Sequence, residues 1–367
     1  MVEKKVNKLF FVLTTILLAV GILIFYSAVL GFAARDNLEY SRLIFSQLVI
    51  GLLGGITAGF IVFSVKYSFF RKIAPYLFLT SFIILLLVFI PGIGYEHNGA
   101  KRWIDLFGFS FQPIELLKIS AIIFFSAWIA KFQKRNEKTR FGVISFVSLL
   151  ALCAVPLILQ PDFDGIVLLA IPLISILLVS NAPIKELFIF GISGLLILSI
   201  AILTIDNLSH VKKRIAGYFD AESGALTSNY QVRQSLLAIG SGEVLGKGYG
   251  QSSQKFIYLP EPAGDSIFAV YAEEMGFVGG VLLIILYTLW TLSGYKIANE
   301  MRDNFSKYFI TGSITMLSAQ SFINIASMTG LIPIVGMPLV FISQGGTALL
   351  INLCIVGLIL NMSQYKK

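Results

Sequence analysis

The feature that most constrains this chain is the recurrence of apolar runs about 18 residues or longer, each able to cross a hydrocarbon core of roughly 30 Å as a helix. In lipid, every backbone polar group must be paired inside the protein, so such runs fold into a helical bundle. The sequence therefore predicts an all-α polytopic membrane protein with a single membrane domain over residues 1–367. About ten spans are predicted, with these approximate bounds: 9–31, 43–64, 73–91, 113–131, 142–159, 164–181, 186–205, 266–292, 307–329 and 344–362.

The charge content agrees with a membrane protein, since 13% of the residues are charged and 56% are hydrophobic. The net charge of +8 needs no nucleic acid partner, because most of the excess falls in short loops on one side of the predicted bundle. Cys153 and Cys354 lie within apolar runs, so no disulfide is predicted. His97 and His210 are not spaced as metal ligands, and no metal site is predicted. No cofactor is evident, and the sequence leaves dependence on a divalent cation open.

The distribution of positive charge predicts the orientation. Lys and Arg concentrate in the loops 66–72, 131–140 and 296–307 and in Lys366 and Lys367 near the C-terminus. The short loops on the other side carry few of them. Loops rich in Lys and Arg remain in the cytoplasm, so both termini of this multi-pass protein are predicted to be cytoplasmic.

One long polar segment, residues 206–265, separates the predicted seventh and eighth helices. Its aromatic content and balanced charge argue against disorder, and an ordered loop of this length is usually functional. The predicted topology places it outside the cytoplasm together with three other polar or Gly/Pro-rich segments: 97–115, 160–165 and 332–346. Four such segments on one membrane face predict a site on the extracytoplasmic side.

Two groups of charged residues lie at the start of the predicted fourth helix. Glu115 and Lys118 are one helical turn apart inside its outer end, where ionisable groups are costly and usually functional. An i, i+3 pair can equally be a buried structural ion pair. The second group is Lys101, Arg102 and Trp103. It is either an aromatic belt residue with cations that extend to the membrane interface, or a binding site for phosphate. The residue types alone leave both questions open.

Asp265 ends the long polar segment where the predicted eighth helix begins. Asp is a favoured N-cap, so this residue is either a helix cap or a functional carboxylate. Gln160-Pro161-Asp162 is either a plain turn or part of the site. The glycine-rich stretch Gly240–Gly250 lacks the Lys-Ser/Thr pair of a nucleotide-binding loop, so ATP binding is not predicted.

Four stretches of the chain resemble signature motifs of the SEDS family. Asn98–Lys118 is similar to the motif before the fourth helix, and Gln160–Gly165 (QPDFDG) is similar to the family's QPD loop. Tyr230–Gly280 resembles the long extracytoplasmic loop with its following helix, and Gly330–Gly346 resembles the last signature. The resemblance covers nearly the whole chain and implies a single SEDS-type domain. The stretch SQKFIYLPE is more similar to the FtsW/SpoVE division branch than to the RodA elongation branch.

The chain departs from the family pattern at several motif positions. Asp164 stands where Gly is common, and Ile114 stands where Ser is usual. Gly264 and Ser266 flank Asp265, where Thr and Phe are usual. None of the charged motif residues is missing.

The resemblance implies a peptidoglycan glycosyltransferase of the bacterial cytoplasmic (inner) membrane, acting in wall synthesis during division or elongation. Its substrate is lipid II, the undecaprenyl-diphosphate-linked disaccharide peptide, which it polymerises into glycan strands. Asp265, by its position in the LPE…D motif, is then the catalytic base of an inverting transfer. The following residues are expected to bind substrate: Lys101, Arg102, Trp103, Glu115, Lys118, Asp162, Arg233, Lys247, Lys255 and Glu274. The expected partners are a cognate class B penicillin-binding protein transpeptidase (FtsI-like) and other divisome membrane proteins.

Two other functions compete with this interpretation. A lipid II flippase is expected to carry charge along a path near the bilayer midplane. Here the inner halves of the predicted spans are nearly free of ionisable residues and the outer ends are not, which favours an enzyme at the outer face. A divisome scaffold whose loop only binds partners leaves Glu115, Lys118 and Asp265 unexplained.

Overall fold

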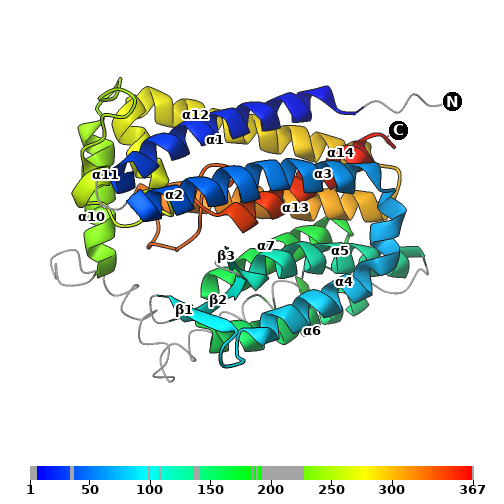
Figure 1. The fold of residues 1–367 in the computed structure, drawn as a ribbon. Helices are drawn as coiled ribbons and strands as arrows, with labels where there is room; N and C mark the ends of the chain where they lie inside the picture. Colours follow the sequence, from blue (N-terminus) through cyan, green and yellow to red (C-terminus); the bar gives the residue numbers. More distant parts are fainter. Residues whose placement is uncertain are drawn as a thin grey trace.

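A computed structural model of the chain describes residues 6–33, 37–97, 100–106, 109–134, 140–183, 185–186, 189, 191 and 227–365. Figure 1 shows long helices that lie side by side, with short elements gathered at one end of the bundle. The helices and strands, in chain order, are α1 (Lys8–Ala33), α2 (Asn37–Phe45), the π-helix η1 (Ser46–Gly54), α3 (Gly55–Ser64), α4 (Tyr67–Leu87), β1 (Gly94–His97), β2 (Ala100–Leu106), β3 (Phe109–Phe111), α5 (Pro113–Lys134), α6 (Arg140–Leu159), α7 (Phe163–Val179), α10 (Thr227–Ser241), α11 (Gln254–Ile257), α12 (Ile267–Glu300), α13 (Asn304–Met328) and α14 (Gly346–Ser363).

The polytopic helical class predicted from the apolar runs is confirmed. In the described chain, eight helices are long and apolar enough to cross a membrane, and the shorter apolar helix α7 matches a further predicted span. The second span is longer than predicted, because α2, η1 and α3 follow one another without a break. The predicted span 186–205 lies almost wholly outside the described residues, as does the loop portion 206–226. The number ten therefore stays a prediction.

Three helices form the centre of the bundle. Within α5, α13 and α14, 78%, 72% and 78% of the membrane-length window is buried in the protein, whereas α2–α3 and α4 each bury only 22%. The outer helices therefore present most of their apolar surface to lipid. The central helix α13 is rich in buried Ser, Thr, Gln and Asn side chains, which permit close packing and hydrogen bonds between membrane helices.

Glycines at four-residue spacing bring α14 close to the η1–α3 segment. Gly51, Gly55 and Gly59 recur on one helix face. A methyl group on Gly59 would lie 2.8 Å from the backbone oxygen of Leu353, and one on Gly357 would collide with the backbone of Gly59. The two backbones approach this closely because no side chain separates them, as in other small-residue contacts between membrane helices.

A three-stranded antiparallel sheet in the order β1-β2-β3 precedes α5. The sheet was not predicted, because the sequence pattern of this region indicates only a polar segment. In the sheet, Tyr95 lies opposite Trp103 and Ile104 lies opposite Phe111. Ile104 is buried while Lys101 is exposed, so the sheet has an inner and an outer face. The sheet is small beside the helices, and the predicted all-α class holds.

The two described chain ends meet at one end of the bundle, where the amide of Asn7 donates to Ser363 Oγ at 3.2 Å. At the opposite end, α10 runs across the long helices, and α11 and the strands lie nearby (Figure 1). This agrees with a topology in which both termini share one side and the polar segments share the other. The side that faces the cytoplasm stays a prediction.

Gly59→Ala is expected to destabilise the bundle. Its methyl group must displace the backbone of α14, and overpacking of this kind costs about 1–3 kcal/mol. Gly54→Ala is the matched control, since a methyl group there lies 3.5 Å from its nearest neighbours. Thermal unfolding in detergent compares the two variants. A midpoint for Gly59→Ala that equals or exceeds that of Gly54→Ala would contradict this packing.

Candidate active site

The chain between α13 and α14 is not helical, and it folds against the start of α12. Non-helical backbone at membrane depth must find hydrogen-bond partners inside the protein. Asn324 of α13 donates through Nδ2 to the carbonyls of Met337 and Asp265, at 2.7 and 2.8 Å. One turn earlier, Gln320 donates to the carbonyl of Pro338 at 2.9 Å. These buried side chains fix the non-helical chain against the residues that precede α12.

The portion from residue 336 to residue 345, here called the 336–345 segment, is also held from two other directions. Ser343 Oγ donates to the carbonyl of Gly264 at 2.7 Å. Gln47 of η1 donates to the carbonyl of Ser343 at 3.2 Å and accepts from the amide of Gly345 at 3.0 Å. Gln47 is buried in a π-helix, a conformation frequently found at functional sites. The segment is thus held between η1, α13 and the chain before α12.

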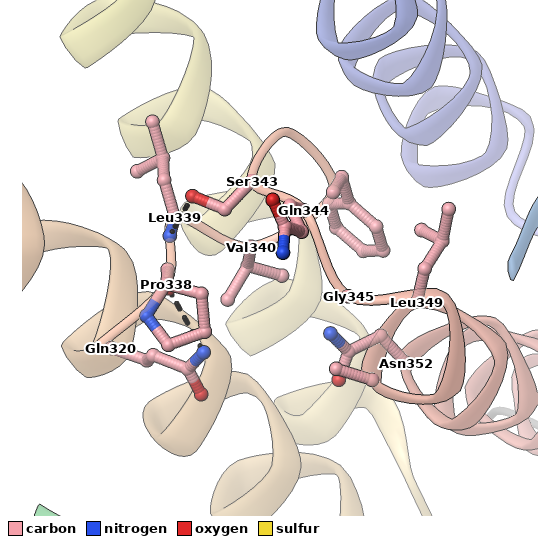
Figure 2. A pocket seen from close by; sticks show the side chains of 11 residues that line it. Gln320, Pro338, Leu339, Val340, Ser343, Gln344, Gly345, Leu349 and Asn352 are labelled. Atoms are coloured by element: carbon pink, nitrogen blue, oxygen red, sulfur yellow. Dashed lines mark hydrogen bonds between the residues drawn. The ribbon is translucent and has the colours of Figure 1, made fainter. Parts of the chain in front are cut away.

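A small pocket lies between this segment, α13 and α14 (Figure 2). Amide side chains from three parts of the chain line it: Gln320, Gln344 and Asn352. Figure 2 shows Ser343 turned toward Leu339 and Gln320 turned toward Pro338, the positions in which their hydrogen bonds form. Two polar residues of the pocket lining, Gln320 and Ser343, therefore hold the 336–345 segment in place.

Asp265 is half-buried directly before α12. The helix begins at Ile267 with Ser266 in the N-cap position, so the alternative in which Asp265 is the N-cap is wrong. Gln231 of α10 donates to the Ser266 hydroxyl at 2.9 Å and ties α10 to this helix start. The Asp265 Oδ2 atom lies 3.3 Å from the position that a Cβ on Gly336 would take. Gly336 is exposed, so this carboxylate borders an accessible part of the 336–345 segment.

The start of α7 also approaches Gly336, since Asp164 Oδ2 is 3.5 Å from the same Cβ position. Asp162 caps α7 by accepting from the amide of Gly165 at 3.2 Å. Arg102 of β2 has a guanidinium nitrogen 3.8 Å from the Asp162 carboxylate and donates to two carbonyls of the preceding turn. Arg102 and Asp162 therefore stabilise the turn that brings Asp164 to Gly336.

Glu115 and Lys118 form a buried ion pair, with Nζ and Oε1 separated by 2.9 Å. Lys118 also donates to Gln320 Oε1 at 3.4 Å. Because Gln320 holds the 336–345 segment, the pair is connected to the same segment that borders Asp265. Both interpretations from the sequence, a structural pair and a functional one, fit this geometry.

The glycine-rich stretch Gly240–Gly250 is hydrogen-bonded to the backbone of α12 at a break in that helix. Gly276 has φ 66° and ψ −167°, a conformation that residues with a side chain rarely adopt. Two amides of the stretch donate to the carbonyls of Glu273 and Glu274, at 3.1 and 2.9 Å. Two of its carbonyls accept from the two amides that follow Gly276, at 2.9 and 3.1 Å. The stretch therefore supplies the hydrogen bonds that the backbone of α12 lacks at the break.

Two ion pairs, here called the loop clamp, hold the same region on α12. Lys247 Nζ lies 2.6 Å from Glu273, and Lys255 Nζ lies 2.6 Å from Glu274. Lys255 is buried and also donates to Ser27 Oγ of α1 at 3.0 Å. Removing one member of a buried pair leaves an uncompensated charge, which costs about 3–5 kcal/mol.

Tyr249 adds a contact between the glycine-rich stretch and α1. Its hydroxyl donates to the carbonyl of Leu23 at 2.8 Å. Burial raises the pKa of Tyr249, and the nearby Glu274 carboxylate adds to this effect. The hydroxyl therefore remains a protonated donor at neutral pH.

The predicted site residues fall into separate groups. Five border the 336–345 segment, the start of α7 or the Gln320 contact: Asp265, Asp162, Arg102, Glu115 and Lys118. Three belong to the loop clamp: Lys247, Lys255 and Glu274. The other three lie on β2 or α10: Lys101, Trp103 and Arg233. Lys101 and Arg233 are exposed and form no ion pair with another described residue. Substrate contact by all of these residues stays a prediction.

Metal binding has limited support from the side chains alone. The described residues contain no group of three or more His, Cys, Asp or Glu side chains that could hold a metal ion. Asp164 and Asp265 form only a pair of carboxylates at Gly336. A Mg²⁺ ion at such a pair would also take ligands from water or from substrate phosphate.

Several residues on which this arrangement depends were not predicted from the sequence: Gln47, Gln320, Asn324, Gly276 and Gly336. Two signals were available. Gln320 and Asn324 are amides one turn apart in a predicted membrane helix, where buried polar side chains usually have a structural or functional partner. Gly276 interrupts a helical apolar run, where glycine is unfavourable without a packing or functional reason.

Lys255→Met is expected to lower the thermal midpoint in detergent, because Glu274 then remains buried without its cation. Combining it with Glu274→Leu is expected to recover much of the loss, since an apolar pair often replaces a buried ion pair without penalty. Glu243→Gln is the control, because it removes an exposed acidic group from the same loop. Parental stability in the single variant, or no recovery in the double variant, would contradict the loop clamp.

Comparison with known proteins relates the whole chain to one family. Residues 7–367 match the FtsW/RodA/SpoVE family, described as cell cycle proteins. Stage V sporulation protein E of Bacillus subtilis (strain 168) is 34% identical over 359 residues, which cover 97% of this chain and 96% of that protein. The probable peptidoglycan glycosyltransferase FtsW of Geobacter sp. (strain M18) is 34% identical over 351 residues, which cover 96% of this chain and 95% of that protein.

Solved structures share the fold. A chain in a structure of a peptidoglycan synthase complex gives a TM-score of 0.79 at 24% identity, over 99% of both chains. The rod shape determining protein RodA of Thermus thermophilus gives 0.71 at 23% identity, over 99% of this chain and 98% of that chain. The family match over residues 7–367, the relatives that are 34% identical and the shared fold agree, and the chain belongs to the FtsW/RodA/SpoVE family of multi-pass membrane proteins.

Proposed function

We propose that this protein is a peptidoglycan glycosyltransferase that polymerises lipid II at the extracytoplasmic face of the bacterial cytoplasmic membrane. The observation that carries the proposal is the setting of Asp265, half-buried beside an exposed glycine of the 336–345 segment. The chain around it is fixed by hydrogen bonds to its backbone. Relatives that are 34% identical over nearly the whole chain include a probable peptidoglycan glycosyltransferase, which supports the proposal.

Asp265 acts as the general base. Its carboxylate accepts the proton of an acceptor sugar hydroxyl while that oxygen attacks the anomeric carbon of the donor sugar. The new glycosidic bond forms as the bond to the diphosphate breaks, and undecaprenyl diphosphate leaves as an anion. Attack from the side opposite the leaving group inverts the anomeric carbon. A base held by a fixed backbone lowers the entropic cost of reaching this arrangement.

The leaving diphosphate requires cations that are not already neutralised. Lys101 and Arg233 fit this need best, because both are exposed and neither is paired with another described residue. Lys247 and Lys255 already have carboxylate partners at 2.6 Å, so we assign them to the loop clamp. Arg102 keeps part of its side chain exposed and is available for a further contact.

The distribution of charge favours this activity over lipid transport. A conduit needs polar groups near the bilayer midplane. In α12, the acidic residues Glu273 and Glu274 lie near one end, and Lys296 and Glu300 lie near the other. The described helix α14 carries no Asp, Glu, Lys or Arg. The ionisable side chains are therefore grouped toward the ends of these helices.

The orientation and the partner belong to the same proposal. Both termini face the cytoplasm, so α10, α11 and the sheet face outward. A class B penicillin-binding protein is the expected partner, and the similar fold of a chain from a peptidoglycan synthase complex supports this. Relatives named FtsW and stage V sporulation protein E support a role in division-type wall synthesis.

Asp265→Asn is expected to reduce polymer formation by roughly 10²-fold or more, the scale of losing a general base. Because Ser266 occupies the N-cap, the amide leaves the start of α12 intact. The assay uses purified protein with lipid II, with and without the transpeptidase partner, and measures glycan chains and the thermal midpoint. Glu243→Gln should behave as the parent protein. An Asp265→Asn protein that polymerises lipid II at close to the parental rate would overturn the assignment.

The exchange of Glu115→Lys and Lys118→Glu tests whether this pair only stabilises the fold. The exchange preserves the ion pair but turns a carboxylate toward Gln320 Oε1, which now accepts from Lys118. We expect strongly reduced polymer yield at a thermal midpoint close to the parental one. Near-parental yield would show that the pair is only structural.

A further inference from the structure

Asp164 and Asp265 border the same small space. The Oδ2 atoms of Asp164 and Asp265 lie 3.5 and 3.3 Å from the Cβ position of Gly336, so they are no more than 6.8 Å apart, the sum of the two distances. Both residues are half-buried, and Gly336 is exposed. The Cβ atom of any other residue at position 336 would lie within 3.5 Å of both carboxylates. Glycine leaves that space accessible from outside.

Other residues hold the cap and the turn at the start of α7. Asp162 already caps the helix through Gly165. Arg102 already binds the turn before the helix. An acidic residue in the first turn interacts favourably with the helix dipole. That effect needs no particular direction of the side chain, whereas an Asp164 oxygen lies at Gly336 beside the proposed base.

Two carboxylates whose oxygens are no more than 6.8 Å apart can both accept from adjacent hydroxyl groups of one sugar. Each ionised carboxylate only accepts hydrogen bonds, and a hydroxyl is a natural donor to it. Neighbouring hydroxyls on a pyranose ring are about as far apart as two hydrogen-bonded oxygens. One of them can therefore reach Asp265 while the next one reaches Asp164.

We propose that Asp164 binds the hydroxyl adjacent to the attacking hydroxyl of the acceptor sugar, as a substrate-binding residue additional to the proposed base. This inference rests on the proposed function, because it takes Asp265 as the residue that meets the attacking hydroxyl. Asp164 then fixes the rotation of the sugar ring, so that the attacking oxygen points at the donor.

The test measures binding separately from turnover. Labelled lipid II is titrated onto the parent, Asp164→Asn and Glu243→Gln proteins in detergent, and the same proteins are titrated with undecaprenyl diphosphate, which carries no sugar. Losing a hydrogen bond to a charged group is expected to weaken lipid II binding by about tenfold or more for Asp164→Asn. Undecaprenyl diphosphate binding should be unchanged, and Glu243→Gln should match the parent for both ligands.

Parental lipid II affinity in Asp164→Asn would overturn the inference, and so would an equal loss for both ligands. The titrations are repeated in EDTA, since a difference that disappears there would mean that Asp164 binds a cation and would also overturn it. Polymerisation assays on the same proteins test the proposed glycosyltransferase activity separately from the role of Asp164 in binding. A parent that binds lipid II but makes no polymer with its partner contradicts the proposed function, while the titrations still decide the role of Asp164.

Discussion

Irregular backbone can lie inside a membrane bundle only where its amides and carbonyls are hydrogen-bonded, because an unsatisfied buried group costs several kcal/mol. The 336–345 segment meets this requirement through side chains of its neighbours. Gln320 and Asn324 reach its carbonyls from α13, and Gln47 reaches it from η1. Asn324 also binds the carbonyl of Asp265, so the bonds that permit the irregular chain fix the proposed base.

The same requirement explains the second polar region. Gly276 breaks α12, and the glycine-rich stretch supplies the partners that the broken helix has lost. The loop clamp then holds this stretch through side chains, with Lys255 and Glu274 buried against α1. The glycine-rich stretch is therefore attached to the bundle through contacts other than those that hold the 336–345 segment. This division separates residues that hold the loop from residues that border the accessible space at Gly336.

Hydropathy predicted the membrane helices well, because a run of apolar residues has one stable arrangement in lipid. It could not predict the sheet before α5, whose strands are short and carry polar residues on one side. It also could not predict the break at Gly276, since a glycine in an apolar run is tolerated in many helices. The partners of that break lie about 30 residues away along the chain and were not readable from local pattern.

The candidate site was predictable to a similar extent. Asp265 was singled out by its place at the end of the polar segment, and its catalytic role came from the resemblance. Its cap interpretation failed because the helix starts one residue later than expected. Lys247 and Lys255 were predicted to bind substrate as cations for the diphosphate of the lipid substrate that the resemblance implies. Their carboxylate partners, Glu273 and Glu274, lie on α12. The sequence does not show which lysines have such a partner in the fold, so paired and unpaired lysines could not be told apart. In the sequence, Asp164 stood out only as a departure from a family motif. The structure shows that its carboxylate lies close to Gly336.

A structure of the Asp265→Asn protein with bound lipid II, determined by electron cryomicroscopy, tests the central claim most directly. We expect the acceptor disaccharide over Gly336, with one sugar oxygen within hydrogen-bond distance of position 265 and the next near Asp164. The loop clamp should keep both ion pairs. A disaccharide bound against Lys247 and Lys255, with the space at Gly336 empty, would contradict the proposed role of Asp265.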